Sequence, residues 1–258
     1  MILHQAKVLR SVIATLLEGG RGVMGTPNPR QPAKPIRLYD FEASPYCRRV
    51  REVLTMLNLD VEIYPCPKKG TRFRPQVEQL AGKTQFPFLV DENTGIKLLE
   101  SQDIIDYLFK TYGKTGKTPS KYQNLPKIPI GGFLVTIAGG INGLMADKAN
   151  AQKALPDQML ELWSFEGSPF SRLVRERLSE LELPYILHNV AKERWQDMGP
   201  AKLRLKPGKY VPIKDGKRAS VYAAQGRLQV PYLVDANTGV NLYESKDILA
   251  YLNKTYGA

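Results

Sequence analysis

The chain has 258 residues, 43% of them hydrophobic and 24% charged, which is typical of a soluble globular protein and leaves room for two compact domains. Its net charge of +12 favours anionic partners, such as small acids, an acidic protein surface or nucleic acid. Two cysteines without a secretory signal argue against a disulfide-stabilised secreted protein, and no apolar run reaches the length of a membrane helix. We therefore expect a cytoplasmic protein without a transmembrane segment, or a protein of the plastid stroma if the source is a plant or an alga.

Residues 1–35 form a basic amphipathic leader followed by a Pro-rich spacer. Part of the leader recurs 121 residues later, where Thr15, Gly19, Gly22 and Met24 match Thr136, Gly140, Gly143 and Met145. A cleaved targeting segment has no reason to recur, so we interpret the leader as an apolar packing element. A fortuitous match of a few glycines is an equally good alternative.

The next segment, residues 36–113, shows the pattern of a small α/β domain. Strands are expected at 36–41, 61–64, 88–90 and 96–99, and helices at 45–57, 74–80 and 102–110. Pro87 stands directly before the third strand, and Asn93-Thr94-Gly95 is typical of a hairpin turn. The order is βαβ, then a helix, then ββα.

The helix that begins after Ser44 is the most informative element. Ser44 is a good N-cap, and Pro45 suits the first helical position, where no N–H is needed. Unpaired N–H groups and the helix dipole make such a terminus a place to hold an anion, a thiolate or a carboxylate. Cys47 lies one turn further on, beside three arginines.

The whole pattern then repeats. Residues 38–57 return as residues 162–181 with an offset of 124, and residues 86–113 return as 230–257 with an offset of 144. We interpret the chain as a tandem duplication, with a linker at 114–159 that contains an apolar segment and a second copy at 160–258. The second copy carries about twenty extra residues, for which we predict a hairpin at Lys206–Arg218 with a turn at 214–217. Residues 192–229 hold ten basic and three acidic residues, a local charge of +7.

Three motifs of the chain, each present twice, resemble those of a known protein family. The segment S-P-[YF]-[CS]-R-x-V-R, the X-Pro before the third strand, and Glu-Ser-x-Asp-Ile at the last helix resemble the N-terminal thioredoxin-fold domain of glutathione transferases, and are equally similar to glutaredoxin. The two-in-tandem arrangement resembles a group of plant and cyanobacterial proteins. The resemblance implies two tandem thioredoxin-like domains, each with a mixed four-stranded sheet and with Phe86-Pro87 and Val230-Pro231 in cis.

The resemblance also implies a glutathione site in each copy. Ser44 and Ser168 match the residue that donates a hydrogen bond to the glutathione thiolate, although Ser-Pro also caps helices without any ligand. Phe86-Pro87 and Val230-Pro231 match the segment that pairs with the cysteinyl backbone. The γ-glutamyl group would be held by two matching pairs, Glu100-Ser101 and Glu244-Ser245.

Three features depart from the family pattern. The attacking cysteine of a dithiol glutaredoxin is replaced by Ser44, and the second position, Cys47, is either a thiol activated by nearby arginines or a small buried side chain. The second copy has Ser168 and Ser171 there and no thiol. A second thioredoxin-like unit stands where transferases carry an all-helical domain.

We therefore expect a glutathione-binding, transferase-like protein with weak or specialised activity, and not a dithiol glutaredoxin. The alternative is a non-catalytic scaffold whose basic insert docks an acidic protein. Cys47 and Arg49 favour tighter binding of glutathione to the first copy, because added positive potential suits an anionic ligand. Nucleic acid is not the expected partner, and His4 and His188 are too few for a metal centre.

Overall fold

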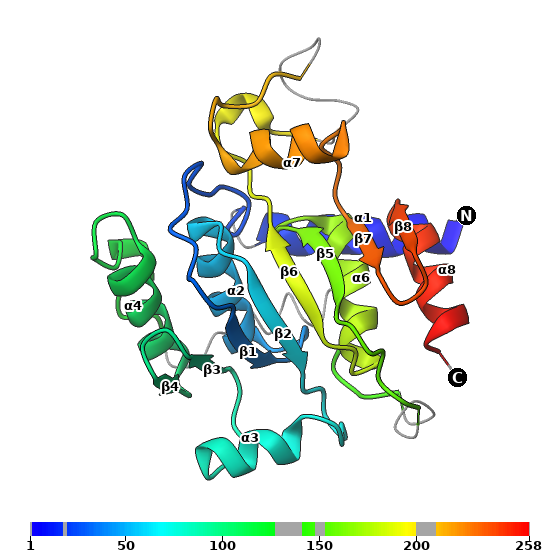
Figure 1. Cartoon of the computed structure of the whole chain (residues 1–258), viewed down its shortest axis with the longest axis horizontal. Helices are drawn as coiled ribbons and strands as arrows, with labels where there is room; N and C mark the ends of the chain where they lie inside the picture. Colours follow the sequence, from blue (N-terminus) through cyan, green and yellow to red (C-terminus); the bar gives the residue numbers. More distant parts are fainter. Residues whose placement is uncertain (1, 18–19, 127–140, 148–152, 200–209, 258) are drawn as a thin grey trace.

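The computed structural model describes all residues except 1, 18–19, 127–140, 148–152, 200–209 and 258 (Figure 1). The first half contains α1 (Ile2–Leu17), β1 (Ile36–Asp40), α2 (Pro45–Leu57), β2 (Val61–Pro65), α3 (Arg74–Ala81), β3 (Phe88–Asp91), β4 (Ile96–Leu98) and α4 (Ser101–Tyr112). The second half contains β5 (Leu160–Ser164), α6 (Pro169–Glu180), β6 (Tyr185–Asn189), α7 (Lys217–Gln225), β7 (Tyr232–Asp235), β8 (Val240–Tyr243) and α8 (Ser245–Thr255). Short 3-10 turns cover Ser120–Tyr122 and Trp195–Asp197.

The two first helices begin where the Ser-Pro pairs predict. Ser44 is in an extended conformation and accepts the N–H of Cys47, while Ser168 does the same for Ser171. Each Pro occupies the first helical turn, where its missing N–H costs nothing. Asn58 ends α2 in the left-handed conformation, with φ of 57°.

Each half builds the strand pattern of a thioredoxin-like unit. β1 pairs in parallel with β2 and antiparallel with β3, and β3 pairs antiparallel with β4. β5, β6, β7 and β8 repeat these relations. The Phe86-Pro87 and Val230-Pro231 bonds are both cis, which confirms that prediction.

The prediction of two separate four-stranded sheets is wrong. β2 and β6 pair antiparallel, with Val61 opposite Leu187 and Ile63 opposite Tyr185, so one eight-stranded sheet runs in the order β4-β3-β1-β2-β6-β5-β7-β8. The physical reason is that β2 and β6 would each be an edge strand in an isolated unit, with unpaired N–H and C=O groups. Pairing the two edges satisfies these groups and joins the halves.

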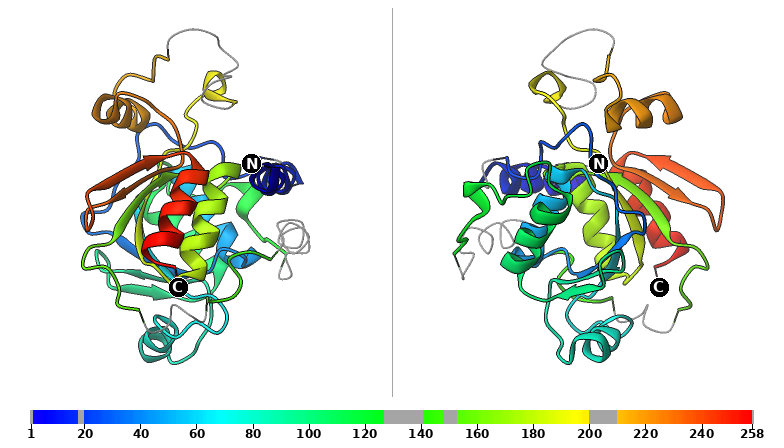
Figure 2. Two further views of the ribbon diagram at one scale, coloured as in Figure 1. Left: turned by 90° about the vertical axis from the view of Figure 1, so that its right-hand side faces the viewer. Right: turned by 60° about the vertical axis from the view of Figure 1, so that its left-hand side comes forward.

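The helices and the sheet form layers. Helices α2, α4, α6 and α8 cover one face of the sheet, and α1 packs on α6 on the same side (Figure 2). The main apolar core lies between these helices and the sheet and includes residues of both halves, such as Leu38, Val53, Leu162 and Val174. Helices α3 and α7 lie at opposite ends of the molecule (Figure 1).

The segment that precedes each half packs on the other half. Gly22 O accepts the N–H of Gly167, and Val23 O accepts the N–H of Lys192. In the same way, Leu144 O accepts the N–H of Lys68. Gly22 and Gly143, which match each other in the sequence, have φ of 71° and 72°. The matching Thr136 and Gly140 lie outside the described residues, as does Gly19.

The predicted hairpin at Lys206–Arg218 is wrong over its described part. Residues 214–216 do form a turn, but Lys217 and Arg218 begin helix α7. At the repeat offset of 144, α7 is the counterpart of α3 in the first copy. Arg218 is buried and donates to the carbonyl oxygens of Val190 and Ala191. The last residues of the segment therefore belong to a helix that has a counterpart in the first copy.

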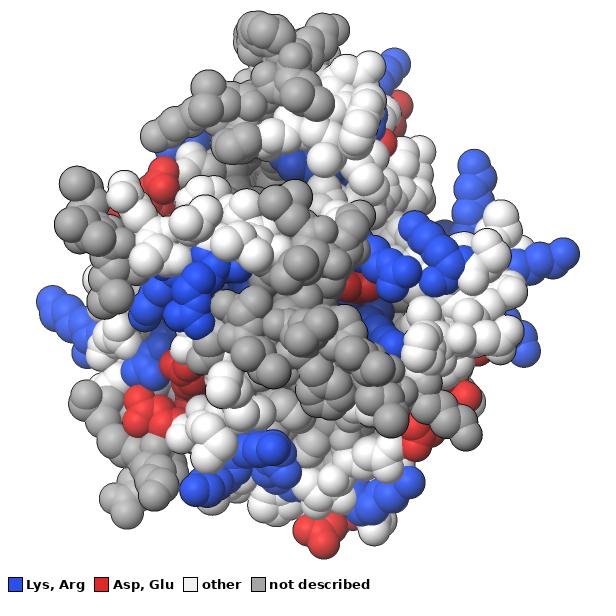
Figure 3. Space-filling view, turned by 180° about the vertical axis from the view of Figure 1, so that it is seen from behind, with Lys and Arg blue, Asp and Glu red and all other residues white. Residues whose placement is uncertain are grey.

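On the face seen in Figure 3, Lys and Arg of the described residues stand in several separate groups, with Asp and Glu between some of them. No helix in the described part of the chain is both long and apolar enough to cross a membrane.

Candidate active site between Ser168 and Ser245

A pocket of about 420 Å³ lies at the start of α6 in the second copy. Its wall contains every residue that the sequence assigned to the second site: Ser168, Val230, Pro231, Glu244 and Ser245. These residues come from the beginnings of α6 and α8 and from the segment before β7. Apolar side chains provide much of the remaining wall, including Val23, Phe165, Phe170 and Leu228.

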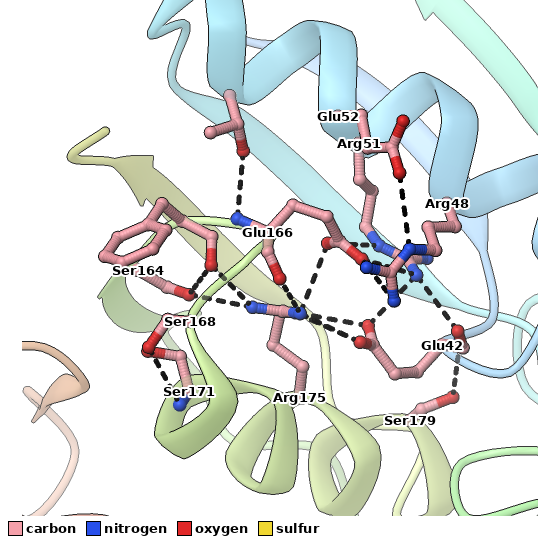
Figure 4. A network of polar contacts seen from close by, with 12 residues as sticks. Glu42, Arg48, Arg51, Glu52, Ser164, Glu166, Ser168, Ser171, Arg175 and Ser179 are labelled. Carbon is pink, nitrogen blue, oxygen red and sulfur yellow. Dashed lines mark hydrogen bonds and ion pairs between the residues drawn. The ribbon is translucent and has the colours of Figure 1, made fainter. Parts of the chain in front are cut away.

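Ser168 caps α6 and is one of the residues that line this pocket. Only 2% of the residue is exposed, and its Oγ accepts hydrogen bonds from Ser171 N at 3.3 Å and from Ser171 Oγ at 2.9 Å (Figure 4). The dipole of α6 adds positive potential at the same place. This combination favours a thiolate or another anion.

Glu244 and Ser245 line the same pocket where α8 begins. Glu244 has φ of 67°, a left-handed conformation that is strained for a residue with a side chain, and its carboxylate accepts from Gln229 Nε2 at 2.7 Å. Ser245 begins α8 and lies 3.3 Å from His4 Nε2 of α1. In the first copy the matching Glu100 has φ of −84°, without this strain. Strained backbone is concentrated at functional sites, so the difference points to the second copy.

Two basic residues of the pocket were missed from the sequence. Lys192 is 8% exposed, and its Nζ lies 5.7 Å from the centre of the Phe165 ring and donates to Gly199 O. Arg218 is 3% exposed and donates hydrogen bonds to the carbonyl oxygens of Val190 and Ala191 and to the Tyr210 hydroxyl. Arg218 could have been found, because Arg74 matches it at the offset of 144.

The matching place in the first copy is filled differently. Phe86 stands where the second copy has the smaller Val230, and its ring lies edge-on to Phe41 with 6.2 Å between centres. The guanidinium of Arg74 lies 4.8 Å from the centre of the same ring. Ser44 is 3% exposed and caps α2, while Glu100 accepts from Gln85. Phe86 therefore carries a large ring at the position where the pocket of the second copy is lined by the smaller Val230.

Neither cysteine is placed as a reactive thiol. Cys47 and Cys66 are both fully buried and unbridged. Burial raises the pKa of Cys47 to about 12 and the pKa of Cys66 well above its usual value. A thiol with a raised pKa carries almost no thiolate at neutral pH. The structure thus favours the interpretation of Cys47 as a small buried side chain.

A buried ionic cluster joins the two halves, and our sequence analysis did not predict it. Arg51 of α2 and Arg175 of α6 lie beside Glu42 and Glu166, which precede these two helices (Figure 4). Arg51 Nε is 3.0 Å from Glu166 Oε2, and Arg175 Nη2 is 3.0 Å from Glu42 Oε1, so each arginine binds the acid of the other half. All four side chains are at most 6% exposed.

The four central residues of the cluster are arranged almost symmetrically, but their neighbours differ. Arg51 also contacts Asp40, whereas Arg175 donates to Ser164 Oγ at the matching position. Burial raises the pKa of Asp40 to about 6, although Arg51 opposes the change. For Glu42, burial alone would raise the pKa, but Arg175 and Arg51 outweigh it and lower the pKa. The repeated Glu and Arg, each at an offset of 124, were the signal in the sequence.

The comparison with known proteins agrees with the fold. The family model for the glutathione S-transferase N-terminal domain matches residues 38–118 and 162–258. The chain therefore belongs to the family of glutathione S-transferase N-terminal domains. No curated protein and no solved structure matches the chain.

Proposed function

We propose that the chain binds glutathione in the pocket of the second copy and activates its thiol for transferase-like chemistry. The observation that carries this proposal is that Ser168, Val230, Pro231, Glu244 and Ser245 line one pocket of suitable size. This choice differs from the preference for the first copy that the sequence alone suggested.

The roles follow from the chemistry of the ligand. Glutathione has two carboxylates, one ammonium group and one thiol. The start of α8 with Ser245 suits the γ-glutamyl carboxylate, and the Glu244 carboxylate suits the ammonium group. Val230, before cis-Pro231, offers its backbone to the cysteinyl part.

The thiol would then lie near Ser168. A hydroxyl that donates to a sulfur anion lowers the thiol pKa, and the helix terminus and the positive charge of Lys192 act in the same direction. The resulting thiolate would attack an electrophilic carbon, forming an S–C bond while the leaving group departs with its electron pair. The apolar wall made by Phe165, Phe170 and Leu228 suits an apolar electrophile.

Calorimetric titration of the whole chain with glutathione tests the binding site. We expect about one equivalent to bind, and Val230→Phe to lower the affinity at least about tenfold, because the larger ring would fill the pocket. Ser245→Ala and Glu244→Gln should each cost ~1–3 kcal/mol of binding free energy.

The first copy supplies matched controls. Ser101→Ala and Glu100→Gln change the corresponding residues and should leave the affinity within about twofold. The proposal fails if glutathione releases no heat and protects nothing from thermal unfolding, or if the first-copy changes abolish binding and the second-copy changes do not.

The scaffold that docks an acidic protein stays a prediction. The charges of Lys217 and Arg218 in the basic region are already used inside the molecule, where Lys217 binds Asp60 and Arg218 holds backbone carbonyls. A docking surface would have to rely on the other basic residues of this region.

A further inference from the structure

The two Ser-Pro sites differ in the residue three positions after the capping serine. In the second copy this residue is Ser171, which is completely buried, and its hydroxyl donates to Ser168 Oγ at 2.9 Å (Figure 4). In the first copy it is Cys47, also completely buried. Both residues donate their backbone N–H to the serine at 3.3 Å, so the caps themselves are equivalent.

The extra hydroxyl decides where the Ser168 proton points. A serine hydroxyl has two acceptor lone pairs and one donor hydrogen. In Ser168 both lone pairs are used, one by Ser171 N and one by Ser171 Oγ. The remaining direction at the oxygen is that of the O–H bond, and within the described part of the chain Ser168 donates to no acceptor. Ser168 lines the pocket, so its proton is available to a ligand there.

Cys47 does not impose this orientation on Ser44. A thiol is a weak donor and a weak acceptor, so it does not hold the second lone pair of the serine as a hydroxyl does. The Ser44 hydroxyl can instead turn toward the Cys47 sulfur, inside the protein. The same Ser-Pro cap thus presents its proton outward in one copy only.

We infer that Ser171 is a positioning residue for the thiol chemistry of the second copy. By donating to Ser168 Oγ, Ser171 directs the Ser168 O–H at the sulfur of bound glutathione and thereby stabilises the thiolate. The thiol proton leaves to solvent, and Ser168 keeps its own proton. The inference rests on the proposed function, since it requires glutathione in this pocket.

The test is the pKa of the bound thiol in the whole protein, measured from thiolate absorbance as a function of pH, beside affinity from calorimetry. Ser171→Ala should leave the affinity at low pH, where the thiol is protonated, within about threefold. It should raise the thiol pKa by ~1 unit, which is up to about tenfold less thiolate at neutral pH. Ser171→Cys, which copies the first site, should do the same, and Ser171→Thr, which keeps a hydroxyl, should restore the low pKa.

A second comparison separates positioning from a merely structural role. Ser168→Ala should raise the thiol pKa, and adding Ser171→Ala to it should change the pKa no further, because Ser171 acts only through Ser168. Cys47→Ser, far along the chain in the other copy, is the control and should leave the pKa of the second-site thiol unchanged.

The outcomes distinguish the two proposals. Binding with an unchanged thiol pKa in Ser171→Ala and Ser171→Cys would overturn the role of Ser171 and leave the binding site intact. A further pKa rise when Ser171→Ala is added to Ser168→Ala would also overturn it. Absence of binding in the unmodified protein would overturn the proposed function and the inference together.

Discussion

Charged side chains help to join the two halves, beside the paired strands and the shared apolar core. Arg51, Arg175, Glu42 and Glu166 are buried at the junction, where removal of one charge leaves its partners without compensation. Cores usually exclude such groups because transfer of an ion out of water is costly. Here the two arginines also donate to backbone carbonyls, including Glu42 O and Glu166 O, so their remaining N–H groups are used.

We predict that Glu166→Gln lowers the free energy of unfolding by ~3–5 kcal/mol, because Arg51 and Arg175 both lose a charged partner in a buried place. Urea unfolding followed by circular dichroism measures the change. Lys34→Ala is the control: it removes an exposed pair with Glu92, in which the side chains are 66% and 43% exposed, and should cost less than about 0.5 kcal/mol. A loss below about 1 kcal/mol in Glu166→Gln would show that the cluster is not essential to stability.

His188 marks the same junction on the opposite face of the sheet. Its Nδ1 lies 3.2 Å from Asp60 of the first half and its Nε2 lies 2.8 Å from Glu161, while its ring stacks on Trp163. Burial alone would lower the pKa of His188, but the two carboxylates outweigh it and raise the pKa above 6.5. The His188 ring therefore links the two halves through Asp60 and Glu161.

The raised pKa of His188 predicts a pH dependence of stability. Because the folded-state pKa lies above the unfolded value, the stabilisation is fully present below about pH 6.5 and is lost as pH rises through the folded-state pKa. His188→Gln should therefore cost ~1 kcal/mol near pH 6 and almost nothing near pH 9, as measured by urea unfolding. Added salt should narrow the difference at pH 6, and an equal cost at both pH values would contradict the ion pairs.

At the scale of elements, the last helix of each half, α4 or α8, is joined to the preceding hairpin by hydrogen bonds from tyrosine hydroxyls. Tyr107 and Tyr112 of α4 donate to Asp91 at the end of β3, and Tyr251 and Tyr256 at the end of α8 donate to Asp235 of β7. The aspartates also accept from Asn93 and Asn237 in the turns that follow. Burial would raise the pKa of Asp235, but these hydrogen bonds outweigh it and lower the pKa. The D-x-N-T-G turn is thus joined to a helix about twenty residues away.

We predict that Tyr256→Phe lowers the free energy of unfolding by ~1.5–3 kcal/mol, since it removes a hydrogen bond to a charged acceptor. Tyr112→Phe should have the same effect in the first copy. Tyr243→Phe removes only a 3.3 Å bond to the neutral side chain of Gln225 and should cost less than about 1 kcal/mol. Equal costs for all three changes in thermal or urea unfolding would contradict the assignment.

At the scale of the whole molecule, the halves exchange their leading segments. Gly22 reaches the second half, where an added Cβ would lie 2.8 Å from Glu166 Cβ, and Gly143 reaches the first half, where it would lie 2.9 Å from Glu42 Cβ. Both glycines also have positive φ. The crossing segments thus close over the buried ionic cluster from both sides.

Gly22→Ala tests this closure. It combines backbone strain with a steric clash, whereas Gly95→Ala has the same kind of strain, with φ of 72°, and open space around the new methyl group. We expect Gly95→Ala to cost ~1–2 kcal/mol and Gly22→Ala at least about 1 kcal/mol more in urea unfolding. Equal losses would show that Gly22 is needed for its backbone conformation alone.

The chain's local features are readable from the sequence because they depend on neighbouring residues. Ser-Pro predicts the starts of α2 and α6 because the cap and the first turn involve adjacent residues. Asn-Thr-Gly predicts the hairpins for the same reason. The resemblance of the repeated motifs to a known family implied the thioredoxin-like units, the cis bonds before Pro87 and Pro231, and the residues that share the second pocket.

Only the tertiary structure decided what happens between the repeats. Pairing of the β2 and β6 edges, the placing of Arg51 against Glu166 and the exchange of the leading segments join residues more than one hundred positions apart. Periodicity carries no information about such pairs, because it reports only which face of an element is apolar. The difference between the two sites was also not readable from the sequence. It depends on the larger volume of Phe86 compared with Val230 and on the hydroxyl of Ser171. The effect of both is set by the side chains packed around them.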